Sequence, residues 1–109
     1  MSPVLSIAAS GLQHESNRLA VTANNVANLQ TDGFAPRRVL GVEAPGGGVQ
    51  SVVSLQASLA GLDGNLGVNN IDLVAESVSM ITSVRAFEAN AAVIRTEHKM
   101  VGSFLDRVI

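Results

Sequence analysis

The chain has 109 residues, of which 47% are hydrophobic and only 3% aromatic, and it carries a formal charge of −2 with no cysteine. This length predicts a single domain over residues 1–109, with an aliphatic core that favours packed helices over a β-sandwich or a ligand-binding barrel. The absence of cysteine excludes disulfides, thiol catalysis and cysteine metal sites. The seven basic residues are dispersed, so no nucleic-acid partner is expected.

The N-terminal segment 2–29 is predicted to be a helix with Ser2 as its N-cap and Pro3 in its first turn. Large apolar residues recur every seven positions, and small residues follow four positions after three of them, which is typical of a heptad packing seam. The large residues are Leu5, Leu12, Leu19 and Val26, and the small ones are Ala9, Ser16 and Ala23. The small positions would allow a partner helix to approach closely.

The first twelve residues, MSPVLSIAASGL, are mildly apolar but include no basic residue. A cleaved signal peptide is therefore not expected. The chain also has no run of about 18 apolar residues, so no direct membrane insertion is expected.

The middle segment 30–70 combines turn, strand and connector signals. An Asp-Gly pair and an Ala-Pro pair follow the first helix and disfavour its continuation. Residues 37–44 and 49–56 are predicted to be two short strands joined by the glycine-rich turn 45–48. Because a lone hairpin is only marginally stable, this one is expected to lean on a helix or on a neighbouring molecule. The connector 57–70 is assigned no regular structure.

The C-terminal segment 71–108 is predicted to be a second helix, capped by Asn70 or Asp72, with Glu76 at the positive end of its dipole. Its apolar residues again recur every seven positions. They are Leu73, Met80, Phe87, Ile94, Val101 and Val108, and between them lie Ser77, Val84, Ala91, His98 and Leu105. The expected fold is mainly α, with the two terminal helices pairing as an antiparallel coiled coil around a small β-hairpin segment.

Five further apolar residues of the second helix lie off this seam: Val74, Val78, Ile81, Val93 and Phe104. A pair of helices buries one stripe of each, so these residues leave two alternatives open. Either additional helices from other chains cover them, or the protein is a compact monomer in which the hairpin covers them.

No constellation for catalysis occurs in the sequence, so no enzyme activity and no cofactor are expected. There is no nucleophile elbow, and the glycine-rich turn lacks the lysine of a P-loop. His14 and His98 each lack a second metal ligand at helical spacing, and His98 is expected to pack on the seam. Arg85 and Glu88 are expected either to form a solvated ion pair of small energetic weight or to set the register between packed helices.

Two sequence blocks, one near each end of the chain, carry a resemblance to a known family. Residues 10–34, SGLQHESNRLAVTANNVANLQTDGF, contain ANNVAN followed by TDGF, and residues 69–106 contain MI, RAFEAN and a following Ile-x-Thr near a Met. Both blocks, in this order, resemble the terminal signatures of bacterial flagellar basal-body rod and hook proteins.

The resemblance implies a structural role in the flagellum. Members of the family are exported by the flagellar type III apparatus without a cleaved signal, and polymerise with copies of themselves and with other axial proteins into the periplasm-spanning rod and the hook. Their terminal helices pair and form the inner wall of the tube. The short middle segment is similar to that of the small proximal-rod type. A homo-oligomer is therefore expected at high concentration; the alternative is a cytoplasmic coiled-coil adaptor or export chaperone.

The expected assembly and helix-packing residues are seam positions together with the signature asparagines. They are Leu5, Leu12, Leu19, Asn24, Asn25, Val26, Asn28, Leu73, Met80, Val84, Phe87, Asn90, Ala91, Ile94, Val101 and Leu105. Asn24 and Asn25 are expected to be mostly wet in a lone subunit and desolvated only in the tube. Asn28 is a candidate helix cap, and Thr31, Asp32 and Gly33 are expected to form the turn.

Overall fold

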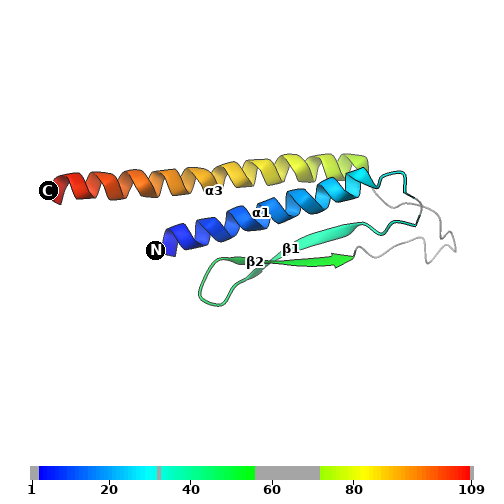
Figure 1. The fold of residues 1–109 in the computed structure, drawn as a ribbon, viewed down its shortest axis with the longest axis horizontal. Coiled ribbons are helices and arrows are strands. Elements are labelled where there is room, and N and C mark those ends of the chain that lie inside the picture. The colour runs from blue at the N-terminus through cyan, green and yellow to red at the C-terminus, as the bar shows by residue number, and fades with distance from the viewer. Residues whose placement is uncertain (1–2, 32, 56–71, 109) are drawn as a thin grey trace.

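The computed structural model describes residues 3–31, 33–55 and 72–108 (Figure 1). Helix α1 spans Pro3–Ala27, strand β1 spans Arg37–Glu43, strand β2 spans Val49–Leu55 and helix α3 spans Leu73–Val108. The predicted mainly α fold with a small hairpin is confirmed. The predicted N-cap Ser2, the turn residue Asp32, the candidate cap Asn70 and the connector 57–70 lie outside the described residues.

The described elements form three layers, with α1 in the middle (Figure 1). Helix α3 lies antiparallel to α1 along one side, and both strands of the hairpin contact α1 from the other side. Among these four elements, neither strand contacts α3. The hairpin therefore leans on a helix of its own chain, as one of the two predicted options.

Helix α1 ends at Ala27, two residues before the predicted Leu29, because Asn28 closes its last turn. The Asn28 backbone N–H donates to the carbonyls of Asn24 and Asn25, and its side-chain Nδ2 donates to the Asn24 carbonyl at 2.9 Å. The Asn28 Oδ1 accepts from the Thr31 hydroxyl at 3.1 Å. These bonds satisfy carbonyls that the end of a helix leaves without partners. The predicted capping role of Asn28 is confirmed.

Helix α3 begins where the side chain of Asp72 supplies the cap. Its Oδ1 accepts hydrogen bonds from the backbone N–H groups of Val74 and Ala75, at 3.0 and 3.3 Å. This is the bond that an N-cap side chain makes with the first turn. Of the two predicted caps, Asp72 therefore fills the role in the structure.

The hairpin pairs seven residues of β1 with seven of β2, from Arg37 opposite Leu55 to Glu43 opposite Val49. Gly46, Gly47 and Gly48 in the connecting turn have φ of 87°, 103° and 89°. Residues with a side chain rarely adopt this left-handed region, so the turn depends on its glycines. The strands end within one residue of their predicted bounds.

The two helices pair through small and polar residues. Ala8, Glu15 and Thr22 of α1 are buried and lie seven residues apart, as do the buried Glu76 and Ser83 of α3; Ala8 is the only fully buried hydrophobic residue among those the structure describes. The helices approach closely at Gly11, where an added Cβ would lie 2.7 Å from the side-chain amide of Asn90. The contact line therefore runs one residue before the predicted small positions Ala9, Ser16 and Ala23, which are exposed.

Most large apolar residues of α3 are exposed on the surface of the subunit. Phe87 and Val84 are each 43% exposed, and His98, which was expected to pack on the seam, is also exposed. The off-seam residues are exposed as well, from 44% for Val93 to 73% for Val74. Because the hairpin lies against α1 and not α3, the alternative in which it covers these residues is wrong.

The close contact at Gly11 predicts a large difference between two chemically identical substitutions. Gly11→Leu must displace the Asn90 side chain, which packs between the helices, and overpacking of this kind typically costs about 1–3 kcal/mol. Gly102→Leu is the matched control, because an added Cβ at Gly102 meets nothing within 4 Å. It should instead stabilise α3 by up to about 1 kcal/mol through helix propensity. Urea unfolding followed by circular dichroism should show opposite shifts; equal shifts would contradict the helix pairing described above.

Candidate assembly site

The signature asparagine Asn25 holds the hairpin to the end of α1. Its side chain is only 2% exposed. Its Nδ2 donates to the backbone carbonyl of Arg37 at 2.8 Å, and its Oδ1 accepts from the backbone N–H of Arg37 at 3.0 Å. The amide thus pairs with the first residue of β1 much as a neighbouring strand would. The expectation that Asn25 is mostly wet in a lone subunit is therefore wrong, whereas Asn24 is exposed as expected.

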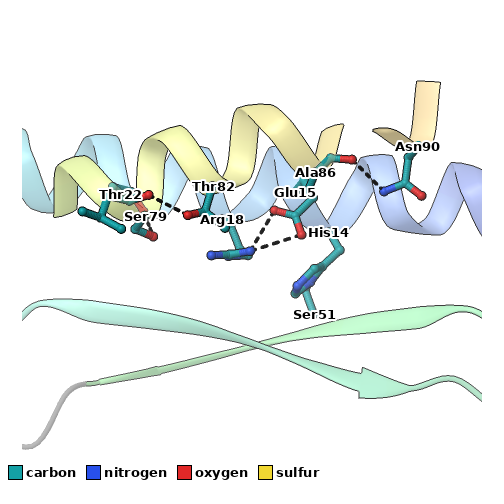
Figure 2. A network of polar contacts seen from close by, with 10 residues as sticks. His14, Glu15, Arg18, Thr22, Ser51, Ser79, Thr82, Ala86 and Asn90 are labelled. Atoms are coloured by element: carbon teal, nitrogen blue, oxygen red, sulfur yellow. Dashed lines mark hydrogen bonds and ion pairs between the residues drawn. The ribbon is translucent and has the colours of Figure 1, made fainter. Parts of the chain in front are cut away.

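A polar contact line joins the middle of α1 to β2. A hydrogen bond of 2.9 Å links His14 Nδ1 and Ser51 Oγ (Figure 2). Asn17 Nδ2 donates to the same oxygen at 3.1 Å. Further along, the Ser10 hydroxyl accepts from the backbone N–H of Val49 at 3.1 Å. The three side chains of α1 occupy positions 10, 14 and 17, which lie on one helix face. They fix the position of the hairpin along α1.

Two glycines of the hairpin lie close to the α1 side chains that form this contact line. An added Cβ at Gly41 of β1 would lie 3.1 Å from His14 Nε2, and one at Gly48 would lie 2.6 Å from Ser10 Oγ. Gly41 therefore belongs to the hairpin for a packing reason, since it lets the strand pass close to the imidazole.

Charged residues from three elements meet near the start of α3. Glu76 is 3% exposed and lines a cavity of about 70 Å³ together with Arg18, Arg37 and Arg38. The Arg18 guanidinium also forms an ion pair with Glu15 at 3.0 Å (Figure 2). Guanidinium groups close to a buried carboxylate offset part of its desolvation cost. The cavity is therefore lined by charged residues of α1, β1 and α3.

The predicted assembly residues divide by exposure in the subunit. Asn25 is buried. The half-buried ones are Leu5, Leu12, Leu19, Val26, Asn28, Met80, Asn90, Ala91 and Ile94, and the exposed ones are Asn24, Leu73, Val84, Phe87, Val101 and Leu105. The structure brings three of them together, because Leu19 of α1 and the pair Val84 and Phe87 of α3 line one groove of about 400 Å³. Val101 and Leu105 lie far along α3 from this groove.

Sequence reasoning missed the buried polar stripe on which the helices pair. Glu15, Thr22, Glu76 and Ser83 carry no apolar signal, so a search for apolar periodicity passes over them. The seven-residue spacing of the small and polar residues themselves was the available signal. Ser83 is the extreme case: its hydroxyl is shielded from solvent and has no hydrogen-bond partner among the described residues.

The described residues show neither a metal cluster nor a membrane span. Within 3–31, 33–55 and 72–108, no three His, Asp or Glu side chains lie together as ligands would. None of the described helices is long and apolar enough to cross a membrane. The Arg85–Glu88 pair, at 3.6 Å, has side chains that are 79% and 60% exposed, so in the subunit it is a solvated pair of small weight.

Comparison with known proteins accounts for both ends of the chain. The family model of the flagella basal body rod protein matches residues 5–34, and that of the flagellar basal body rod FlgEFG protein C-terminal region matches residues 62–107. The flagellar basal-body rod proteins FlgC of Salmonella typhimurium and Salmonella typhi are each 34% identical to it, with 90% of either chain covered. The chain belongs to the flagellar basal-body rod protein family. The resemblance carried by the two sequence blocks is thereby confirmed.

Asn25 lies inside the N-terminal segment that matches the family model. The amide lies where α1 meets the hairpin, and both of its polar atoms are used within the subunit. Its first role is therefore to build the rod-family subunit itself.

Two neighbouring asparagines should respond in opposite ways to replacement by alanine. Asn25→Ala removes both bonds and leaves the N–H and C=O of Arg37 without their partner, which costs about 1–3 kcal/mol for each buried group left unsatisfied. Asn24→Ala is the control, because its side chain is exposed and the change should raise helix propensity by several tenths of a kcal/mol. Thermal unfolding of the isolated subunit measures both. If Asn25→Ala were as stable as Asn24→Ala, the two hydrogen bonds between Asn25 and Arg37 would have no energetic role.

Proposed function

We propose that this protein is a structural subunit of the bacterial flagellar basal-body rod, and that it polymerises through its terminal helices into the axial tube that supports motility. The observation that carries the proposal is the different burial of two sets of residues on the helices. Small and polar residues form the buried contact between α1 and α3, and most large apolar seam residues of α3 are left exposed.

The exposed seam residues of α3 form a surface on which further helices could pack. Leu73, Val84, Phe87, Val101 and Leu105 are each 43% exposed or more, and they follow one another along the whole of α3. A soluble monomer rarely carries an apolar stripe of this length, and such stripes mark interaction surfaces. Packing against helices of neighbouring subunits would remove the stripe from water, at roughly 25 cal/mol for each Å² buried.

The partners that follow from this proposal are copies of this chain, other axial proteins of the rod and hook, and the flagellar type III export apparatus. Rod assembly also implies a place in the basal body, reached without a cleaved signal peptide. The middle segment between the two matched blocks is short, which favours a proximal-rod type of subunit. The FlgC relatives are rod proteins of comparable length, since the match covers 90% of each chain.

A cytoplasmic adaptor or export chaperone is the alternative that experiment must exclude. Such a protein would use the same helices in a fixed small oligomer. Fractionation of motile cells that carry a tagged copy separates the two functions. We expect the tag in purified basal bodies, and loss of motility when the gene is deleted. Recovery of the tagged protein in the cytosol only, with basal bodies of normal composition, would support the adaptor and contradict the rod subunit.

Phe87 tests whether the seam acts in the assembly. Burial of a phenylalanine in a core would make Phe87→Ala cost about 3–5 kcal/mol, but this side chain is 43% exposed in the subunit. We therefore expect a loss of well under half that amount in urea unfolding of the dilute subunit, together with failure to enter basal bodies. Arg85→Ala, on the solvated face, is the control and should enter normally. Normal motility with Phe87→Ala would argue against an assembly role.

A further inference from the structure

The last turns of α3 extend beyond the end of α1. The helices are antiparallel with Gly11 opposite Asn90, and Thr22 meets Ser79. Following the same register, Pro3 at the start of α1 lies opposite His98. Every described residue after His98 is exposed, and Figure 1 shows this part of α3 running past the N-terminal end of α1. We call residues 99–108 the overhang; at about 1.5 Å per residue it is roughly 15 Å long.

The overhang is amphipathic. Its apolar side chains are between 47% and 68% exposed: Met100, Val101, Phe104, Leu105 and Val108. At 100° per residue these five positions fall on one side of the helix, while Ser103 and Asp106 fall on the other. Such a single helix has no described element beside it to cover its apolar side.

A groove between α1 and α3 has the complementary character. It is lined by Leu19, Ser83, Val84 and Phe87 together with the buried Glu15 and, at its rim, the exposed Glu88, and its volume is about 400 Å³. The lining is mostly apolar, and it includes the buried Ser83 hydroxyl that has no partner among the described residues. Glu88 is exposed and pairs with Arg85 of its own helix, and the overhang brings a further cation, Arg107, at the edge of its apolar side.

We propose that the overhang of one subunit docks in the groove between α1 and α3 of a second copy of this chain. The proposal rests on the rod function proposed above, and names the surfaces by which two copies meet. The overhang cannot reach the groove of its own subunit, because Phe104 lies 17 residues beyond Phe87 on one continuous helix, roughly 25 Å away. Docking places the apolar side of the overhang across two helices, and Arg107, at the edge of that side, near the exposed Glu88.

The overhang is the part of α3 best suited to this groove. Its neighbours further back on α3 already have α1 alongside, so their insertion would bring a second helix into collision with the rim. The overhang enters alone and completes a three-helix contact. Exposure of both surfaces in the isolated subunit would then be the state before assembly.

Cysteine cross-linking tests the contact without background, because the natural chain has no cysteine. Two differently tagged copies are expressed together in motile cells, one with Glu88→Cys at the rim and the other with Phe104→Cys on the apolar side of the overhang. A disulfide requires Cβ atoms about 3.5–4.5 Å apart. We expect oxidation of purified basal bodies to give a cross-linked pair carrying both tags. The matched control replaces Phe104→Cys by Asp106→Cys, on the far side of the overhang, and should give no such pair.

A second pair, Val84→Cys with Leu105→Cys, repeats the test at a second position on each surface, and circular dichroism of each variant confirms that it folds. Basal bodies that contain both copies without either cross-link would overturn the docking and leave the rod function intact. Cross-linking to a protein other than this chain would overturn the choice of a second copy. Absence of all copies from basal bodies would overturn the rod function and, with it, the docking.

Discussion

The close approach of α1 and α3 is the constraint on which the rest of the structure depends. Gly11 lets the Asn90 amide lie against the α1 backbone, and the buried residues that follow are small or polar. Helices that meet through small residues approach closely but bury little apolar area, so this contact alone contributes little hydrophobic stability. The large apolar side chains are displaced to the flanks, where a second helix pair can reach them.

The hairpin adds what the helix pair lacks, which is a second fixed neighbour for α1. Asn25 pairs with Arg37, and Ser51 bonds to His14 and Asn17. These contacts are polar and specific in position, so they determine where the hairpin lies without closing off the apolar face of α3. A hairpin that instead covered α3 would have produced a compact monomer. Placing it on the far side of α1 leaves uncovered the side of α3 that faces away from α1 (Figure 1).

Sequence periodicity predicted the elements well, because helix and strand signals are local. The two long helices, the glycine turn, and the caps at Asn28 and Asp72 all follow from residues within a few positions of one another. The partner of Asn25 could not be found in this way, since Arg37 lies beyond a turn and its contribution is backbone, which carries no sequence signature. The pairing stripe was missed for a different reason: apolar periodicity marks the residues most in need of burial, and here a single chain does not bury them.

Polar and apolar contacts have different physical effects, and this difference explains how one fold can have a polar stripe inside the subunit and an apolar stripe on its surface. A buried ion pair or amide contributes little net stability but penalises wrong alignments, because a shift of register leaves polar groups without partners. Thr22, which bonds to Ser79, imposes this penalty between the two helices, and Asn25, which bonds to Arg37, imposes it between α1 and the hairpin. Apolar contacts are less directional and contribute more per unit area. In a subunit built in this way, polar contacts hold the helices in register before assembly. Most of its exposed apolar area is buried only when it packs against a neighbouring subunit.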